Sequence, residues 1–212
     1  MENNVQDIRE EFYRLKANSE FNDSGLLEIK GACFIADEEA IFGMPNEEYI
    51  NKEIMWYNSK SRNVYDMHNP PEVWKKVATA DGRINSNYGW CIYSEDNHRQ
   101  YYNALMHLKQ NPNSRQAMMI YNRPTMHDDA KVDGMKDFMC TNAVTYSVSN
   151  SKNLDCVVQM RSNDAIYGYK NDYAWQKHVL GKLAKDLELT PGTIYWQVAS
   201  LHIYPRHFYL IS

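Results

Sequence analysis

Apolar residues recur every three or four positions in several stretches of this chain, the spacing of helices with one buried face. The clearest stretch, 173–187, is followed by Thr190, Pro191 and Gly192, residues typical of a helix end. Another begins at Asn46, a candidate N-cap. The expected helices, in chain order, are 5–15, 46–59, 73–78, 95–110 and 173–187.

Shorter apolar runs between turn-forming residues predict strands. They are 26–35, 115–121, 140–148, 154–160 and 193–199, with 201–204 as an extension of the last. The third and fourth are separated only by the turn-like 149–153, so we expect them to be neighbours in one sheet. Residues 85–90 are expected to form a polar, aromatic loop and 122–137 a long excursion or hairpin. The pattern predicts a single α+β domain over 1–212, with a mixed or mostly antiparallel sheet and packed helices.

Composition narrows the class of protein. Lys+Arg 23 against Asp+Glu 27 gives a net charge of -4, which disfavours nucleic acid as the main ligand. The four cysteines have no CxxC spacing, so we expect reduced thiols rather than a metal site or disulfides. Residues 1–11 lack the apolar core of a signal peptide and no run is long enough to span a membrane. We therefore expect a soluble, cytoplasmic protein that has no membrane contact.

Polar side chains gather in 161–175, between an expected strand and the expected helix from Tyr173. This stretch holds an arginine, a serine, two aspartates and two asparagines around one glycine. One interpretation is a loop that ends in a helix N-cap at Asp172. The other is an active site anchored at this junction, and the stretch alone leaves both open.

Two further residues carry candidate chemistry. Cys140 begins an expected strand, where a free cysteine is either a small buried apolar residue or a nucleophile. Arg115 and Arg161 lie on strands that could flank it, and positive charge lowers a thiol pKa. Glu53 stands among apolar neighbours in an expected helix, either at the edge of its buried stripe or buried for acid-base work.

Seven short motifs in a fixed order resemble one known family. They are Glu53-Ile-Met-Trp56, Asn87-Tyr-Gly-Trp90, Asn111-Pro-Asn-Ser-Arg115, Phe138-Met-Cys-Thr-Asn142, Arg161-Ser-Asn-Asp164, the stretch from Gly168 to Asp172, and Leu201-His-Ile-Tyr204. Together they resemble the thymidylate synthase superfamily, most closely its bacteriophage deoxycytidylate hydroxymethylase branch. The resemblance covers about 25–208, nearly the whole chain.

The resemblance implies a covalent mechanism on a pyrimidine nucleotide. Cys140 is then the nucleophile that adds to C6 of the base, so that C5 can attack a one-carbon unit from 5,10-methylenetetrahydrofolate. Glu53 is implied to organise water and proton transfer at the far side of the base. Tyr88 is implied to support removal of the proton from C5.

The resemblance also implies the binding residues. Arg161 and Ser162 match residues that hold the substrate phosphate. Arg115 matches a residue that reaches the phosphate bound by a partner subunit, which implies a homodimer with shared sites. The other implied contacts are the sugar for His202 and Tyr204, the substrate for Asn163, and the folate for Asp164 and Gly168.

Asp172 is implied to choose the base. Uracil-specific members of the family carry asparagine there, whereas cytosine offers an amino donor and a bare N3 acceptor, the reverse of uracil. A carboxyl group fits the hydrogen-bonding pattern of cytosine. The wrong base would leave buried polar groups without a hydrogen-bond partner, which costs roughly 1–3 kcal/mol for each group. The implied reaction is hydroxymethylation of dCMP at C5.

The sequence departs from the family at three places. Gln116 stands where the family has a second arginine, Thr141 follows the nucleophile where the synthases have histidine, and the family's basic residue near 23–24 is replaced. The sequence also stops at Ser212, where the family continues into a segment that closes over the folate. An open site that admits water would suit hydroxymethylation, and an incomplete sequence would equally explain the missing segment. Two alternatives remain: a C5-methyltransferase acting on dCMP or dUMP, and a non-catalytic nucleotide- or RNA-binding homologue. A phage-encoded protein would act in the host cytoplasm.

Overall fold

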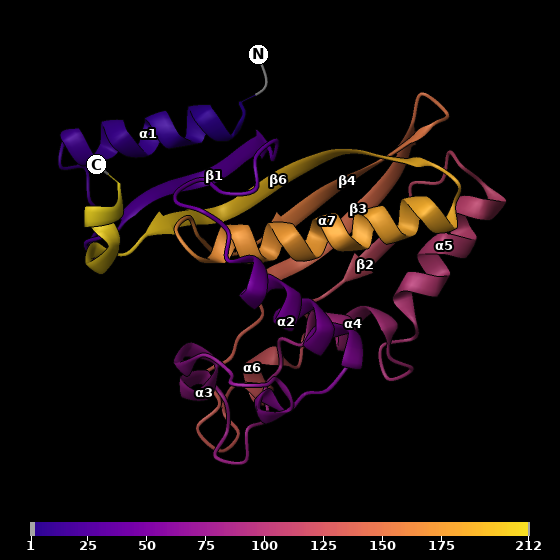
Figure 1. Cartoon of the computed structure of the whole chain (residues 1–212), viewed down its shortest axis with the longest axis horizontal. Coiled ribbons are helices and arrows are strands. Elements are labelled where there is room, and N and C mark those ends of the chain that lie inside the picture. The colour runs from indigo at the N-terminus through magenta and orange to yellow at the C-terminus, as the bar shows by residue number, and fades with distance from the viewer. Residues whose placement is uncertain (1–2, 212) are drawn as a thin grey trace.

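A mixed sheet organises residues 3–211, the part of the chain that the computed structural model describes (Figure 1). The strands are β1 (Leu27–Ile35), β2 (Met118–Ile120), β3 (Thr141–Ser149), β4 (Asn153–Met160), β5 (Asn163–Asp164) and β6 (Thr190–Ile203). Their order is β1-β6-β4-β3-β2, and β5 pairs with β6. Strands β4 and β5 run parallel to β6, and the other pairs are antiparallel. The mixed α+β architecture is confirmed.

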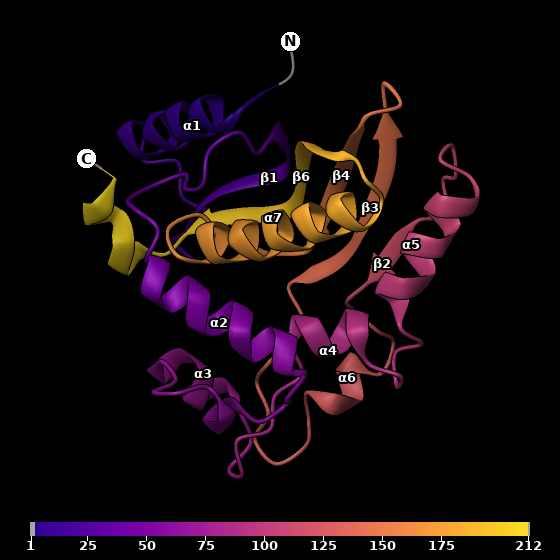
Figure 2. The same ribbon diagram turned by 45° about the vertical axis from the view of Figure 1, so that its right-hand side comes forward.

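One long helix crosses the sheet, and shorter helices lie beyond it (Figures 1 and 2). The helices are α1 (Val5–Ala17), α2 (Glu47–Ser59), α3 (Glu72–Val77), α4 (Tyr88–Tyr93), α5 (Gln100–Gln110), α6 (Met126–Asp129) and α7 (Gly168–Asp186), with 3-10 turns η1 (Val64–Asp66) and η2 (Pro205–Leu210). In both views α2 and α4 lie on the other side of α7 from α1. None of the helices in residues 3–211 is long and apolar enough to cross a membrane.

The core lies between α7 and the sheet. Tyr169 and Trp175 of α7 are fully buried, and Tyr169 meets Trp196 of β6 edge-on with ring centroids 5.2 Å apart. Burial of each such side chain contributes about 1.5–3 kcal/mol. On the other face of the sheet the side chains of Cys33, Gln159 and Gln197 are exposed. Burial alternates along the strands, so residues 3–211 pack only one face of the sheet.

Most expected elements are present, with shifted ends. Strands 140–148 and 154–160 form the antiparallel β3–β4 hairpin, as expected. The helix expected from residue 95 begins at Gln100, and β2 is shorter than 115–121. The excursion 122–137 contains α6 rather than a hairpin, and Thr190 begins β6 instead of ending a helix.

Two corrections bear on the site. Helix α7 begins at Gly168 rather than near Tyr173, so Asp172 lies in its second turn. The N-cap position is Tyr167, without a side-chain cap, and the N-cap interpretation of Asp172 is therefore wrong. Residues 85–90 are not entirely loop, because Asn87 caps α4 by accepting from the Trp90 amide and Tyr88 begins the helix.

Candidate active site

The sequence-predicted catalytic residues come from separate elements and meet at one end of α7. Glu53 is on α2, Tyr88 on α4 and Asp172 on α7, while Cys140 directly precedes β3. Asp172 interacts electrostatically with Glu53, Tyr88 and Cys140, and its carboxyl accepts a hydrogen bond from Asn163. Residues far apart in sequence therefore form one cluster, which we call the carboxyl cluster: Glu53, Tyr88, Cys140, Asn163 and Asp172.

Arg161 holds the segment that carries Cys140. Its Nε donates to the carbonyl of Met139 (2.8 Å) and its Nη2 to the carbonyl of Phe138 (2.8 Å). The same Nη2 lies 3.7 Å from Cys140 Sγ. The guanidinium also stacks over the Phe138 ring, 4.9 Å from its centroid. Arg161 thus orients the thiol and places positive charge beside it.

The thiol is nevertheless less acidic than an ordinary cysteine. Burial, followed by the negative charge of Asp172, raises the pKa of Cys140 to about 11, and Arg161 offsets only part of this. Arg161 lowers the thiol pKa, as expected for a flanking arginine, but burial and Asp172 together outweigh it. Arg115 is exposed before β2, and no hydrogen bond or ion pair joins it to Cys140 within residues 3–211.

Glu53 is a buried carboxyl and not a residue at the edge of the apolar stripe. Only 5% of its surface is exposed. Its Oε1 accepts from the Tyr49 hydroxyl (2.5 Å) and the Trp74 indole (3.3 Å). Burial raises the pKa of Glu53 to about 7, against the effect of these hydrogen bonds. A carboxyl that titrates near neutrality suits proton transfer.

Asp172 is the second carboxyl of the cluster. Its Oδ2 accepts from Asn163 Nδ2 at 2.8 Å. Burial and the nearby Glu53 raise the pKa of Asp172 to about 7, while Tyr88 and Asn163 act to lower it. Two neighbouring carboxyls that disfavour each other's ionisation hold a proton readily at neutral pH.

Tyr88 is buried and stays a neutral phenol. Its hydroxyl oxygen accepts from the Thr141 hydroxyl at 2.9 Å, and its ring stacks on Tyr57. Burial, Asp172 and Cys140 raise the pKa of Tyr88 well above its usual value. A neutral phenol can accept a proton only while it donates its own hydroxyl proton to another group. The geometry at Tyr88 therefore fits a proton relay.

The other residues implied to bind ligands lie between β4 and the start of α7 and at the end of β6. His202 is buried, and its ring meets Tyr204 edge-on at 4.9 Å. Ser162 is half-buried beside Arg161. Gly168 permits a close approach, because a Cβ there would lie 3.1 Å from Asn163 Nδ2 and 3.3 Å from Asp164 Cβ.

Some cluster contacts were missed from the sequence. Tyr49 is one helical turn before Glu53, a spacing that brings two side chains together on a helix face and was available as a signal. Trp74 comes from α3, and no local pattern connects α3 to Glu53. Thr141 was noted only as a departure from the family, whereas its hydroxyl bonds Tyr88.

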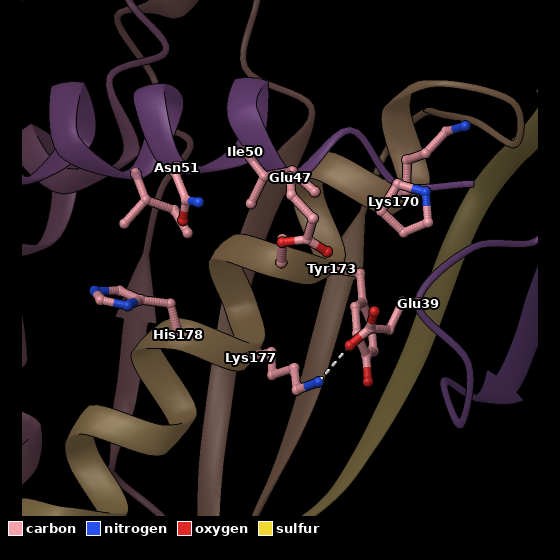
Figure 3. Close-up of a pocket in the computed structure, with 11 residues that line it drawn as sticks. Glu39, Glu47, Ile50, Asn51, Lys170, Tyr173, Lys177 and His178 are labelled. Carbon is pink, nitrogen blue, oxygen red and sulfur yellow. Dashed lines mark hydrogen bonds and ion pairs between the residues drawn. The ribbon is translucent and has the colours of Figure 1, made fainter.

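Two cavities lie beside these elements. One, of about 490 Å³, borders Arg161 and Phe138 and is also lined by Arg123 and His127. The other, of about 260 Å³, lies between α2 and α7, where Lys177 pairs with Glu39 at 2.6 Å (Figure 3). None of the sequence-predicted site residues lines the second cavity. Within residues 3–211, no three His, Cys, Asp or Glu side chains are grouped to hold a metal ion.

The sheet, the crossing helix and a cysteine beside buried carboxyls define a class of protein. The family model for thymidylate synthase matches residues 46–212, and the chain belongs to that family. It is 53% identical over 194 residues to the deoxycytidylate 5-hydroxymethyltransferase of Enterobacteria phage T4, an alignment that covers 88% of this chain and 78% of that protein. The values for the phage T2 protein of the same name are identical.

A bacterial relative is more distant. The thymidylate synthase of Francisella tularensis subsp. holarctica (strain FTNF002-00 / FTA) is 27% identical over 166 residues, which are 73% of this chain and 60% of that protein. The resemblance drawn from the seven motifs, including the phage branch, is confirmed.

Proposed function

We propose that this protein is a dCMP hydroxymethylase. It transfers a one-carbon unit from 5,10-methylenetetrahydrofolate to C5 of dCMP, and water then adds to that one-carbon unit. The products are 5-hydroxymethyl-dCMP and tetrahydrofolate. The observation that carries the proposal is the carboxyl of Asp172 in the cluster with Cys140 and Glu53. A carboxyl group matches the hydrogen-bond donors and acceptors of cytosine, whereas a side-chain amide matches those of uracil. The 53% identity to the phage T4 enzyme supports the same reaction.

Cys140 forms and later breaks the bond to C6 of the base. Its thiol loses a proton as sulfur attacks, and the electrons of the 5,6 double bond move to C5. The pKa of about 11 means that little thiolate exists before substrate arrives. Activation therefore requires a group that takes the proton as the bond forms, and positive charge from Arg161 stabilises the developing thiolate.

The other cluster residues handle protons and water. Tyr88, bonded to Thr141, relays the proton that leaves C5. Glu53, held by Tyr49 and Trp74, takes up and returns a proton near neutral pH and orients the attacking water. Loss of the thiol from C6 then restores the aromatic ring.

The folate is proposed to bind against Asp164 and Gly168. It supplies the one-carbon unit. One oxygen of Asp164 accepts from the Ile166 amide at 3.0 Å, which fixes the carboxyl and leaves its other oxygen to accept from ring N–H groups. The absence of a side chain at Gly168 lets the first turn of α7 lie close to Asn163 and Asp164. The remaining oxygen of Asp164 fits a heterocycle with N–H donors.

A homodimer is part of the proposal. The exposed face of the sheet includes Met118 and Ile120 of β2, 42% and 48% exposed, and Arg115 lies just before them. A second copy packed on this face would cover apolar surface and bring Arg115 toward a neighbouring phosphate site.

One assay tests the function. We expect dCMP, incubated with 5,10-methylenetetrahydrofolate and the protein, to give 5-hydroxymethyl-dCMP by mass, and dUMP to react poorly. Formation of 5-methyl-dCMP with dihydrofolate would identify a methyltransferase instead. No product at all, together with nucleotide binding that survives Cys140→Ser, would identify a non-catalytic homologue.

A further inference from the structure

We propose that Asn163 is a positioning residue that fixes which oxygen of Asp172 carries the proton, and so sets the preference for cytosine. This inference rests on the proposed function. Asn163 is on β5, 3% exposed, and its Nδ2 donates to Asp172 Oδ2 at 2.8 Å.

The hydrogen bond makes the two oxygens of Asp172 unequal. A carbonyl oxygen accepts an amide N–H better than a hydroxyl oxygen does, so a protonated Asp172 carries its hydrogen on Oδ1. Oδ2 is then an acceptor with a second lone pair free, and Oδ1 is a donor. Cytosine needs an acceptor for its amino group and a donor for N3, and both are present together.

Uracil meets the opposite arrangement. Its O4 would face the acceptor Oδ2 and its N3–H would face the Oδ1 hydrogen, so neither contact forms. Without Asn163 the proton could move to Oδ2, and the same carboxyl would then fit uracil. Asn163 therefore decides where the proton lies, and this placement excludes one base.

The asparagine is held in one orientation. Backbone pairing fixes it opposite Leu201 of β6, and Gly168 lies against its amide. Its Oδ1 is buried and accepts a hydrogen bond from no residue in 3–211. The orientation of the Asn163 side-chain amide is therefore determined by its contact with Asp172. With Nδ2 of Asn163 toward Asp172, a donor faces an acceptor, which is favourable. With Oδ1 toward Asp172, two acceptor oxygens would face each other.

The titratable groups that face Asp172 determine how readily it holds a proton. They are Tyr49, Glu53 and Tyr57 on α2, Tyr88 on α4, Cys140 before β3 and Asp164 on β5. With the pKa of Asp172 at about 7, a proton is present on a large fraction of molecules at neutral pH. Asn163 makes the 2.8 Å hydrogen bond that distinguishes Oδ2 from Oδ1, and Tyr88 lies close enough to act on the same carboxyl.

Two substitutions test the inference. Asn163→Leu approximates the shape and removes the donor, and Asn163→Ala removes the whole amide. Dissociation constants for dCMP and dUMP are measured by calorimetry for each variant and for the unchanged protein. We expect the ratio of the two affinities to fall at least about tenfold, or about 1.4 kcal/mol, in both variants. Loss of dCMP affinity accounts for most of the fall.

A matched control is Asn153→Leu, the same change at the start of β4, which should leave the ratio unchanged. Thermal unfolding shows whether each Asn163 variant is folded. If one of the two is not folded, the affinity ratio of the other one tests the inference. Equal loss of affinity for both nucleotides would mean a merely structural residue, and an unchanged ratio would mean no role; either result overturns the inference. If the unchanged protein binds dCMP but makes no product, the proposed reaction fails while the affinity ratio still tests Asn163.

Discussion

The proposed base end of the site and its proposed phosphate end are built differently. At the base end, Asp172 and Glu53 are held by hydrogen bonds from Asn163, Tyr49 and Trp74, all within one chain. At the phosphate end, Arg161 uses its Nε and Nη2 on the backbone carbonyls of 138 and 139. The base end is therefore preorganised before substrate arrives. At the phosphate end, by contrast, a single chain leaves room for further charged groups to contact the phosphate.

This difference separates specificity from affinity. Discrimination between bases depends on short, buried contacts, which lose their effect if they shift slightly. Phosphate attraction depends on charge and tolerates imprecise placement, so a second subunit can contribute it. We expect changes at the base end to alter which substrate reacts, and changes at the phosphate end to alter how tightly any nucleotide binds.

The largest effect is expected at Cys140, where the two ends meet. Cys140→Ser removes the attacking sulfur and should reduce kcat by about four orders of magnitude or more, with dCMP binding preserved. Steady-state turnover and calorimetric binding measure the two quantities. Cys33→Ser, on the exposed sheet face, is the matched control and should retain activity.

The next effect concerns the base. Asp172→Asn should move the ratio of kcat/KM for dCMP over dUMP toward dUMP by about 10- to 100-fold, because each mismatched polar contact costs roughly 1–3 kcal/mol. Asp128→Asn, in α6, is the control for loss of a carboxylate elsewhere. A ratio that did not change would remove Asp172 from base recognition.

A smaller effect is expected on stability as pH changes. The pKa of Glu53 is about 7 in the folded chain against 4.5 for an ordinary glutamate, so folding favours the protonated form. The stability that this proton contributes is present below about pH 4.5 and is lost as pH rises through about 7. Each pKa unit corresponds to about 1.4 kcal/mol.

Glu53→Gln should therefore become more stable relative to the unchanged protein as pH rises over this interval. Thermal unfolding from about pH 5 to about pH 8, a range that covers most of the interval between the two pKa values, measures the difference. Parallel curves for the two proteins would show that Glu53 does not titrate in this range.

The smallest effect is expected at the phosphate end. Gln116→Arg restores a charge that the family carries and should raise affinity for both dCMP and dUMP a few fold, by about 0.2–1 kcal/mol, less at high salt. Gln110→Arg, exposed at the end of α5, tests whether any added charge has this effect. A gain for dCMP but not for dUMP would contradict the separation of the two ends.

The sequence predicted the members of the carboxyl cluster better than their surroundings. Glu53, Tyr88, Cys140 and Asp172 were named from motifs, and the structure brings them together. The raised pKa of Cys140 was not predictable, because burial is a property of the assembled fold and outweighs one nearby charge.

The start of α7 was misplaced for a physical reason. Gly168 and Asn171 are weak helix formers, so the local pattern indicated a loop. Packing of Tyr169 against Trp196 in the core overrides that preference. The same packing places Asp172 in the helix, where it faces the site instead of capping.

The short segment between β4 and the second turn of α7 has a consequence for dynamics. Arg161, Asn163, Asp164 and Asp172 all lie within twelve consecutive residues. Asp172 depends on the first turn of α7, whereas Arg161 is held by the carbonyls of 138 and 139 and Asn163 by its pairing with β6. Opening of that turn therefore displaces Asp172 without releasing Arg161 or Asn163. Backbone amides of the first turn of α7 should then exchange with solvent deuterium faster than those of 161–164, and nucleotide binding should slow exchange most in that turn.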